Sequence, residues 1–281
     1  MRRALRNPQL VAGGVIVLAI LLVALFHPFL APYGVEQMDM ANRLSGPSAR
    51  HWLGTDNFGR DLWTRLSYGA AISMSIAMAS VLIAGTVGTT IGLISGYAGG
   101  WLDLALSRLV DLFLAFPPLI LALALIAVLG PGPVNVTIAI SAAFWTQYAR
   151  VVRAITLAER ERDYVLAAEA VGASLGRILG RHILPNAAGP ILVLATLVVG
   201  TAIVTESGLS FLGLGVQPPT PTWGWTLSYG LRFLRSDPWM STLAGLTIML
   251  TVLGFNLLGD GLRDHLDPRG VIRRARKNPV S

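Results

Sequence analysis

The stretch "LSYGAAISMSIAMASVLIAGTVGTTIGLISGYAGGWL", residues 66–102, contains no Asp, Glu, Lys or Arg. An Asp, Lys or Arg at the centre of a bilayer costs about 2.5 to 3.5 kcal/mol, so long charge-free runs are typical of helices that cross membranes. About 20 residues, each rising 1.5 Å, suffice to cross roughly 30 Å of hydrocarbon. The stretch therefore predicts a membrane-spanning helix.

The whole chain has the same character. It has 281 residues, of which 53% are hydrophobic and 13% charged, and its mean hydropathy is +0.62, unlike the balance of a soluble domain. The charge-free run at 112–149 is too long for one crossing and is interrupted by "GPGP" at 130–133, which predicts a turn. The other charge-free runs are residues 7–35, 183–205 and 238–259. We therefore expect an all-α membrane protein with six transmembrane helices.

The distribution of charge predicts the orientation. Basic residues outnumber acidic ones in residues 1–6, 150–181 and 260–281. They balance in 31–65 and 206–240. Because basic excess marks the cytoplasmic side, and six spans is an even number, both termini are expected in the cytoplasm. The link at 103–111 nets −1, so its cytoplasmic placement rests on the alternation of spans alone. Residues 7–35 exceed a signal core and are expected to form an uncleaved anchor.

Residue types that carry chemistry are scarce. The chain has no Cys, which excludes disulfides, thiol nucleophiles and thiolate metal sites. Its one lysine is Lys277, whereas a phosphate-binding P-loop needs a lysine directly after its last glycine. The net charge of +7 comes from arginines scattered over several segments, which argues against nucleic-acid binding. We expect no catalytic residue, metal site or cofactor on this chain. The histidines, too far apart for a metal site, are His27, His51, His182 and His265.

A stripe of small residues recurs every fourth position within the quoted stretch. This spacing places the small side chains on one helix face and lets another helix approach closely. We favour packing within the bundle or against a partner subunit, and lining of a pore is the weaker alternative. The stripe consists of Ser80, Ala84, Gly88, Gly92 and Gly96.

A polar segment, "RDYVLAAEAVGASLGRILGRHILPN" at 162–186, separates two apolar runs. Its alanines favour a short helix over 163–171, on which Val165, Ala168 and Val171 share a face. Gly172 permits a turn that residues with a β-carbon resist. A second helix is expected near Ser174. An ordinary loop on the membrane surface is one reading, but the alanine patch ringed by arginines favours docking into a groove of another protein.

The segment resembles the cytoplasmic loop of ABC importer permeases, whose pattern is E-A-A, three residues, G, nine residues, I-x-L-P. Ala167, Ala168 and Gly172 match it, as do Leu184 and Pro185, while the glutamate and isoleucine positions hold leucine and histidine. Four more stretches resemble the C-type subunit of dipeptide and oligopeptide permeases: "HWLGTDNFGRDLWTRLSYGA", "SGYAGGWLDLALSRLVDLFLAFP", "SGLSFLGLGVQPP" and "FNLLGDGLRDHLDPR". The resemblance runs from Asn7 to Arg269.

This resemblance implies a type I ABC importer permease in the inner membrane. Such a subunit forms half of a translocation path for di- or oligopeptides by alternating access. The implied partners are a second, homologous permease in a heterodimer, two ATPase subunits that bind ATP and Mg, and an extracytoplasmic solute-binding protein. ATP hydrolysis is expected on the ATPases, so this chain is not expected to be an enzyme. The implied ATPase-coupling residues are Arg162, Asp163, Ala167, Ala168, Glu169, Gly172, Ala173, Ser174, Leu184 and Pro185.

We divide the chain into three parts on this basis. Residues 1–66 form an anchor helix and an extracytoplasmic segment, 67–262 form a five-helix permease core, and 263–281 form a basic cytoplasmic tail. The coupling loop lies within the core at 158–185.

The two external segments are expected to meet the binding protein. In residues 31–65, Asp56, Arg60 and Asp61 are expected to form ion pairs with one another. Glu206, at the end of the fifth span, is expected to snorkel to water. Asp56, Arg60 and Glu206 remain candidates for a gate or a binding-protein contact. Residues 206–240 should form a rigid, aromatic-rich cap through Pro218, Pro219, Pro221, Trp223 and Trp225.

Two alternative functions stay open. An importer of the same family could carry nickel chelates or glutathione, since specificity in such systems lies mostly in the binding protein. A channel or secondary transporter would instead predict ionisable residues within the spans, and the charge-free runs contain none.

The charge asymmetry predicts that Ser48 is external and Ser174 cytoplasmic. Because the chain has no native Cys, Ser48→Cys and Ser174→Cys can each be tested with a membrane-impermeant thiol reagent in intact cells. We expect labelling of the Ser48 variant only, and of both variants once the cells are opened. Labelling of the Ser174 variant alone in intact cells would reverse the topology.

Overall fold

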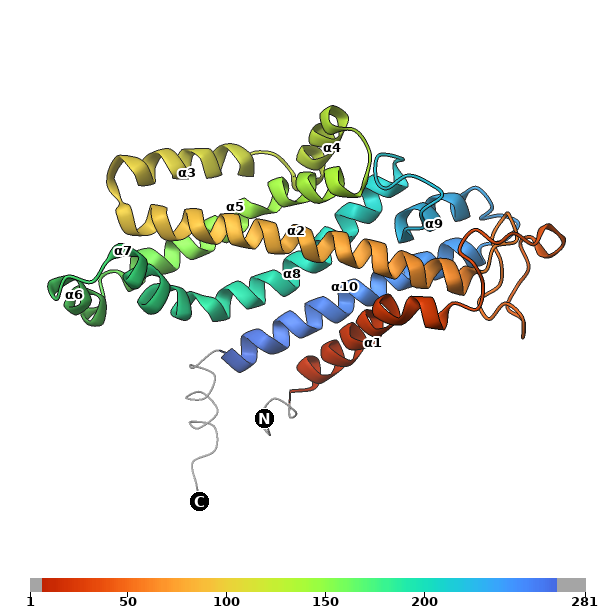
Figure 1. Cartoon of the computed structure of the whole chain (residues 1–281), viewed down its shortest axis with the longest axis horizontal. Coiled ribbons are helices and arrows are strands. Elements are labelled where there is room, and N and C mark those ends of the chain that lie inside the picture. Colours follow the sequence, from red (N-terminus) through yellow and green to blue (C-terminus); the bar gives the residue numbers. More distant parts are fainter. Residues whose placement is uncertain (1–6, 267–281) are drawn as a thin grey trace, which may run out of the picture.

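The computed structural model describes residues 7–266, which form helices and no strand apart from an isolated bridge between Thr55 and Asp61. Five long helices run along the long axis of the molecule (Figure 1). They are α1 (Pro8–Leu30), α2 (Leu62–Ala98), α5 (Pro133–Glu159), α8 (Leu184–Phe211) and α10 (Trp239–Leu266). The shorter elements are η2 (Met40–Asn42), α3 (Gly100–Leu114), α4 (Pro118–Leu129), α6 (Asp163–Ala170), α7 (Leu175–Arg177), η3 (Ile178–Ile183) and α9 (Trp223–Leu231).

Four of the described helices are long and apolar enough to cross a membrane. They are α1, α2, α10 and the continuous helical stretch Leu175–Phe211, which joins α7, the wide-turned η3 and α8. A fifth is counted if α3 and α4 form one span bent by 89°. The expectation of an all-α membrane protein is confirmed. α5, with 27 residues, lies along α2 but does not meet the same test of length and apolarity.

The third expected span is not a straight helix. α3 already begins at Gly100, so the link at 103–111 lies within a helix. Gly99 and Gly100 have φ values of +64° and +58°, a region that favours glycine, and they let α3 fold back beside α2. Pro117 and Pro118 interrupt the helix because proline lacks an N–H and disfavours helical geometry in the preceding residue.

Two boundaries of the proposed division of the chain fall inside helices. The boundary between residues 66 and 67 falls inside α2, and the boundary between 262 and 263 falls inside α10. Residues 1–6 and 267–281, which hold the amino-terminal arginines and most of the basic tail, lie outside the described residues.

The stripe of small residues on α2 faces α5. A Cβ atom on Gly88 would lie 2.2 Å from the carbonyl oxygen of Trp145, and one on Gly92 would lie 2.7 Å from the carbonyl oxygen of Ala149. Gly96 meets Thr156 at a similarly short distance, 2.7 Å. The other two members, Ser80 and Ala84, are also buried. The residue numbers of the contacting residues increase in the same direction along both helices, so α2 and α5 run parallel.

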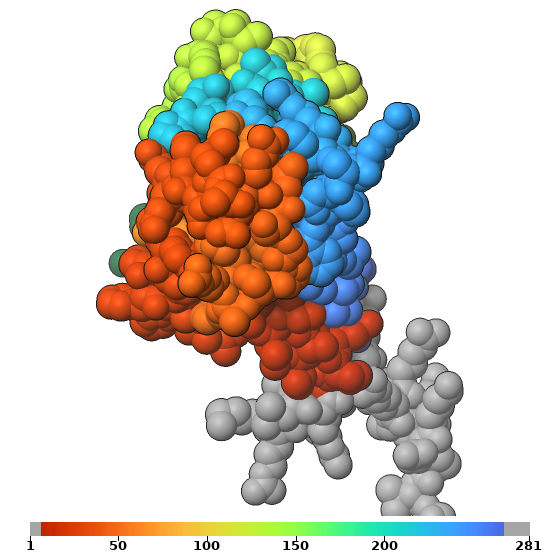
Figure 2. Space-filling model, turned by 90° about the vertical axis from the view of Figure 1, so that its right-hand side faces the viewer, coloured from red at the N-terminus to blue at the C-terminus, as the bar shows by residue number. Residues whose placement is uncertain are grey.

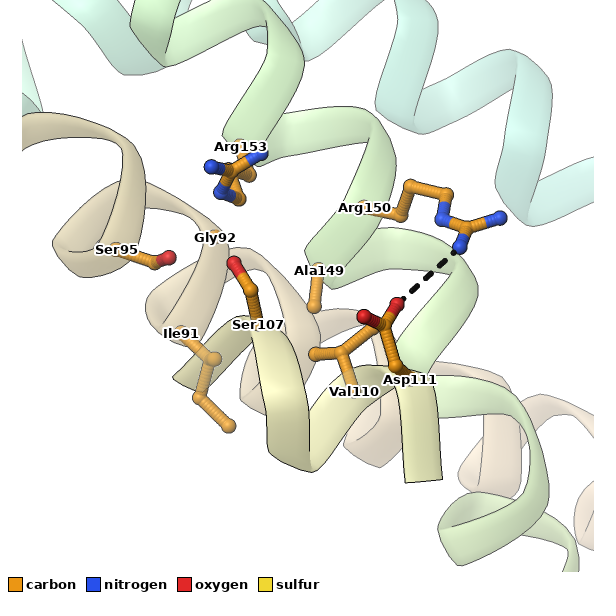
Figure 3. A pocket seen from close by; sticks show the side chains of 9 residues that line it. All are labelled: Ile91, Gly92, Ser95, Ser107, Val110, Asp111, Ala149, Arg150 and Arg153. Carbon is orange, nitrogen blue, oxygen red and sulfur yellow. Dashed lines mark hydrogen bonds and ion pairs between the residues drawn. The ribbon is translucent and has the colours of Figure 1, made fainter. Parts of the chain in front are cut away.

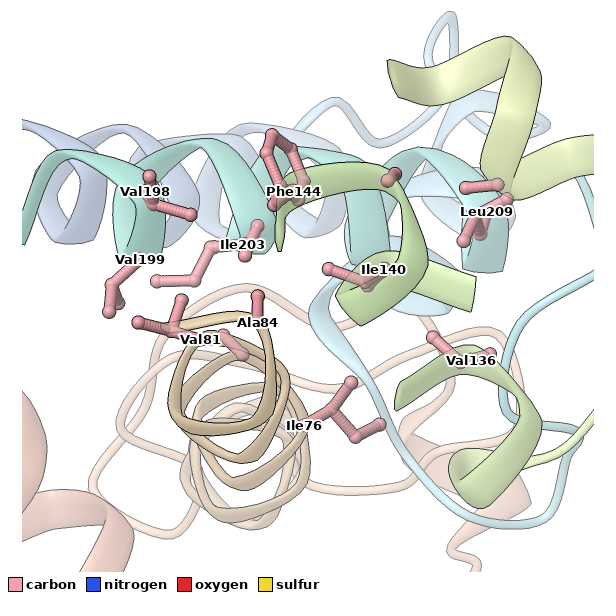
Figure 4. Packing of buried hydrophobic residues seen from close by; sticks show 14 of the residues in the cluster. Ile76, Val81, Ala84, Val136, Ile140, Phe144, Val198, Val199, Ile203 and Leu209 are labelled. Atoms are coloured by element: carbon pink, nitrogen blue, oxygen red, sulfur yellow. The ribbon is translucent and has the colours of Figure 1, made fainter. Parts of the chain in front are cut away.

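A second backbone contact joins α1 to α10. A Cβ atom on Gly13 would lie 2.4 Å from the backbone nitrogen of Leu258, and one on Gly261 would lie 2.6 Å from Leu10. No pattern in the sequence predicted this contact. The core between α2, α5 and α8 is filled by branched and aromatic side chains (Figure 4). They include Ile76, Val81, Val136, Ile140, Phe144, Val198, Ile203 and Leu209.

We predict that Gly88→Ala destabilises the protein by about 1 to 3 kcal/mol, because the added methyl group has no room against α5. Gly85→Ala is the matched control, since its Cβ would lie 3.5 Å from Tyr148, an ordinary contact. Alanine favours a helix over glycine by up to about 1 kcal/mol, so this variant should be at least as stable as the wild type. Thermal unfolding in detergent, followed by circular dichroism, measures both. Equal midpoints for the two variants would contradict the backbone contact.

Candidate functional site

The loop between α5 and α8 projects from one end of the molecule as α6 and α7 (Figure 1). Asp163 lies in the first turn of α6, where its charge suits the helix dipole. The helix ends because Gly172 adopts φ +76°. Its N–H donates to the carbonyl oxygen of Glu169, and the N–H of Ala173 donates to that of Ala168, which satisfies the last carbonyls of the helix.

One side chain anchors α6 to the bundle. Val165 is completely buried and packs in a small apolar cluster with Leu93 of α2, Val152 of α5, and Ile178 and Ile183 of η3. The expected common face of Val165, Ala168 and Val171 is divided in the structure. α6 ends at Ala170, so Val171 lies beyond the helix and is 85% exposed.

The outer side of the loop combines exposed apolar side chains with arginines. Leu166, Val171 and Leu175 are exposed, and Arg177 and Arg181 are exposed nearby. Of the sequence-predicted loop residues, Arg162, Asp163, Ala167, Glu169, Gly172, Ser174 and Pro185 are exposed, and Ala168, Ala173 and Leu184 are half-buried. This surface suits docking to another protein better than binding a small molecule.

Two polar contacts join α6 to neighbouring helices. The hydroxyl of Tyr97, near the end of α2, donates to Glu169 at 2.6 Å. The hydroxyl of Tyr164 donates to Glu159, the last residue of α5, and accepts a hydrogen bond from the amide of Asn186 at 2.9 Å. Burial and the hydrogen bond to Glu159 raise the pKa of Tyr164 above its ordinary value. No pattern in the sequence predicted these contacts.

Ion pairs also join α3 to α5. Asp103 forms a two-point pair with Arg153 at 2.6 and 2.7 Å, and Asp111 lies 3.5 Å from Arg150. Arg153, Asp111 and Arg150 line a pocket of about 150 Å³ between α2, α3 and α5 (Figure 3). The acidic groups that give the 103–111 segment its negative charge therefore face arginines of α5. Among the described residues, no three His, Asp or Glu side chains gather in an arrangement that suits a metal ion.

Ion pairs also order the opposite end of the molecule, which faces the viewer in Figure 2. Asp56 and Arg60 are buried and paired at 2.7 Å, so they order the segment between α1 and α2. Asp61 does not join them, contrary to expectation. It pairs with His51 at 2.9 Å and accepts the N–H of Thr64, which caps α2.

The aromatic residues of the expected cap are partly internal. Trp223 is completely buried and donates its ring N–H to the carbonyl oxygen of Leu66 at 3.0 Å. Trp225 stacks on Tyr229 with ring centroids 5.3 Å apart. The prolines Pro218, Pro219 and Pro221 lie between α8 and α9. The 206–240 segment contains the end of α8, all of α9 and the start of α10.

Comparison with known proteins identifies the family. Residues 88–271 match the model of the binding-protein-dependent transport system inner membrane component, and residues 1–47 match the N-terminal TM domain of oligopeptide transport permease C. The dipeptide transport system permease protein DppC of Alkalihalophilus pseudofirmus is 47% identical over 264 residues, which are 94% of this chain and 87% of that protein. The chain belongs to the family of binding-protein-dependent transport system inner membrane components, which are permeases. Further relatives are the glutathione transport system permease proteins GsiD of Pectobacterium atrosepticum and Escherichia coli O6:K15:H31, each 42% identical over 269 residues, covering 95% of this chain and 89% of each relative.

Glu206 of this permease has an unexpected position. The expectation that it snorkels to water is wrong, because it is completely buried within α8. Its carboxylate accepts a hydrogen bond from Ser210 at 2.8 Å, and Ser207 and Ser73 lie close to it. An ionisable residue inside a span was the feature expected of a channel or secondary transporter. Here serines surround it, and the family match identifies a component of a binding-protein-dependent system.

We predict that Glu206→Ala lowers the free energy of unfolding by about 2 to 3 kcal/mol, because it leaves the Ser210 hydroxyl without its partner and opens a cavity. Glu206→Gln keeps the size and an acceptor oxygen and should change stability less. Val204→Ala is the control for truncation on the same helix, since Val204 is 52% exposed. Denaturation in mixed detergent micelles provides the comparison. If Glu206→Ala is no less stable than Val204→Ala, the buried contacts contribute nothing to stability.

Proposed function

We propose that this permease is the C-type subunit of an ATP-driven importer of di- or oligopeptides and forms half of the translocation path by alternating access. The observation that carries the proposal is the projecting loop at α6 and α7, whose exposed apolar and basic side chains suit docking to a motor subunit. The family match includes this loop. The 47% identity to a dipeptide permease favours peptides as the substrate class.

Our proposal includes six spans with both termini in the cytoplasm, counting α3 with α4 as one bent crossing and α5 as another. The parallel course of α2 and α5 supports this count, because the chain must return across the membrane between them. The ends of the described chain lie on the side of α6. Leu266 lies 3.6 Å from the position of a Cβ on Gly189, near the start of α8, and Asn7 contacts the carbonyl oxygen of Gly261 at 3.5 Å.

The proposed assembly contains a second, homologous permease, two cytoplasmic ATPases and an extracytoplasmic binding protein. The ATPases would bind ATP and Mg, and α6 would dock to one of them. The described segments 31–61 and 212–238, at the end opposite α6, would meet the binding protein. Because Asp56 and Arg60 are buried, contacts there would fall to their exposed neighbours.

Glutathione is the second candidate substrate, because two of the relatives at 42% identity transport it by name. Proteoliposomes that contain this chain, its partner permease, the ATPases and the binding protein separate the candidates. We expect ATP-dependent uptake of radiolabelled dialanine. Uptake of radiolabelled glutathione alone would favour the second candidate, and uptake of neither would refute the peptide proposal.

Docking through α6 predicts a specific effect of Gly172→Val. Apart from Gly172 and its two chain neighbours, no atom of the described chain lies within 4 Å of a Cβ at this position, so the positive φ is what requires glycine. Valine there stores about 1 to 3 kcal/mol of strain, and each 1.4 kcal/mol is about tenfold in affinity. We expect normal membrane insertion, but reduced co-purification of the ATPases and reduced uptake.

Two variants control for this effect. Gly172→Asn should be milder, because asparagine tolerates a positive φ. Gly46→Val, in the segment at the end opposite α6, should retain the ATPases, because Gly46 has open space around it and no positive φ. Normal co-purification and uptake by the Gly172→Val protein would mean that the segment is only a surface loop.

A further inference from the structure

The polar contacts of α6 lie at its two ends and reach three different long helices. At the first turn, Tyr164 bonds to Glu159 at the end of α5 and to Asn186 at the start of α8. At the last turn, Glu169 accepts the hydroxyl of Tyr97 from the end of α2 at 2.6 Å. The amide of Asn186 also donates to the carbonyl oxygen of His182 at 2.7 Å, which holds the amide in place.

The apolar anchor lies between these two contacts. Val165 is the one completely buried side chain of α6, and apolar burial is non-directional. A short helix held by a single apolar side chain can turn about that point. Hydrogen bonds are directional, and those to a carboxylate are stronger than neutral ones. The two tyrosine contacts, one on each side of Val165, therefore oppose rotation of α6 relative to the bundle.

We propose that Tyr97 and Tyr164 are positioning residues whose hydroxyl groups hold α6 in a fixed orientation to α2, α5 and α8. The proposal rests on the docking function of α6 given above. A displacement of α6 by a motor subunit then reaches all three long helices together. Without the hydroxyl contacts, α6 turns about Val165, and part of the displacement is not transmitted.

An alternative role for Glu169 makes a different prediction. Glu169 is exposed, so it could instead contact the motor subunit through its charge. In that case Glu169→Gln would be as harmful as Glu169→Ala, and Tyr97→Phe would have no effect. If Glu169 acts through Tyr97, Glu169→Gln keeps an acceptor oxygen and retains function, whereas Glu169→Ala and Tyr97→Phe have equal effects.

The test uses the complete complex in proteoliposomes, with radiolabelled dialanine and radiolabelled glutathione as probes. Three quantities are measured: co-purification of the ATPases, ATP hydrolysis, and substrate transported per ATP hydrolysed. We expect Tyr97→Phe and Tyr164→Phe each to lower the transport ratio about threefold and the double variant to lower it about tenfold, in line with the loss of one or two hydrogen bonds. Co-purification and ATP hydrolysis should stay near the wild-type values. Tyr68→Phe, at the opposite end of α2, is the control and should match the wild type.

Amide hydrogen exchange of residues 163–170 in the full-length chain, purified without nucleotide, provides a readout independent of substrate. Exchange should be faster in the double variant and unchanged in Tyr68→Phe and Glu169→Gln. Unchanged exchange in the double variant overturns the proposal, as does an unchanged transport ratio when the wild type transports a probe. A wild-type complex that transports neither probe refutes the peptide proposal instead, and exchange then decides the role of the tyrosines.

Discussion

Backbone contact between α2 and α5 is the constraint on which the rest of the structure depends. Gly88 and Gly92 let the two helices approach until a side chain as small as a methyl group has no room. Because the helices run parallel, the chain between them must return along their length. The bent pair of α3 and α4 makes this return, and Asp103 and Arg153 fasten α3 against α5. One close contact thus requires an additional element, in the chain between α2 and α5, that runs back along the bundle.

The helical class and much of the span pattern could be predicted from the sequence, because charge-free runs report the cost of placing ions in hydrocarbon. The same criterion misplaced the end of α8. The run at 183–205 stops one residue before Glu206, yet the helix continues to Phe211 because Ser210 and neighbouring serines surround the carboxylate. The bend between α3 and α4 was also missed. Composition shows that a segment is apolar. It does not show that Pro117 and Pro118 divide the segment into two helices that point in different directions.

The candidate site shows a similar division. Local conformational preferences of single residues predict α6, the turn at Gly172 and the second helix, α7. The contacts that hold α6 do not, because Tyr97 and Glu169 are 72 residues apart in the chain and meet only once the bundle has formed. The prediction of orientation from charge was weakest at 103–111, again because it cannot account for contacts that form only in the folded bundle. Net charge counts Asp103 and Asp111 as if they were free, whereas α5 supplies an arginine to each.

The length of α2 has a mechanical consequence. Its 37 residues form a rod of about 55 Å, nearly twice the roughly 30 Å of bilayer hydrocarbon. Such a rod is a lever: a tilt of about 5° around one end displaces the other by about 5 Å at this length. Its glycine contacts with α5 stiffen it, since two rods in backbone contact bend less than one. A small tilt about the end that carries Tyr97 therefore becomes a large displacement at the opposite end, which Asp61 caps.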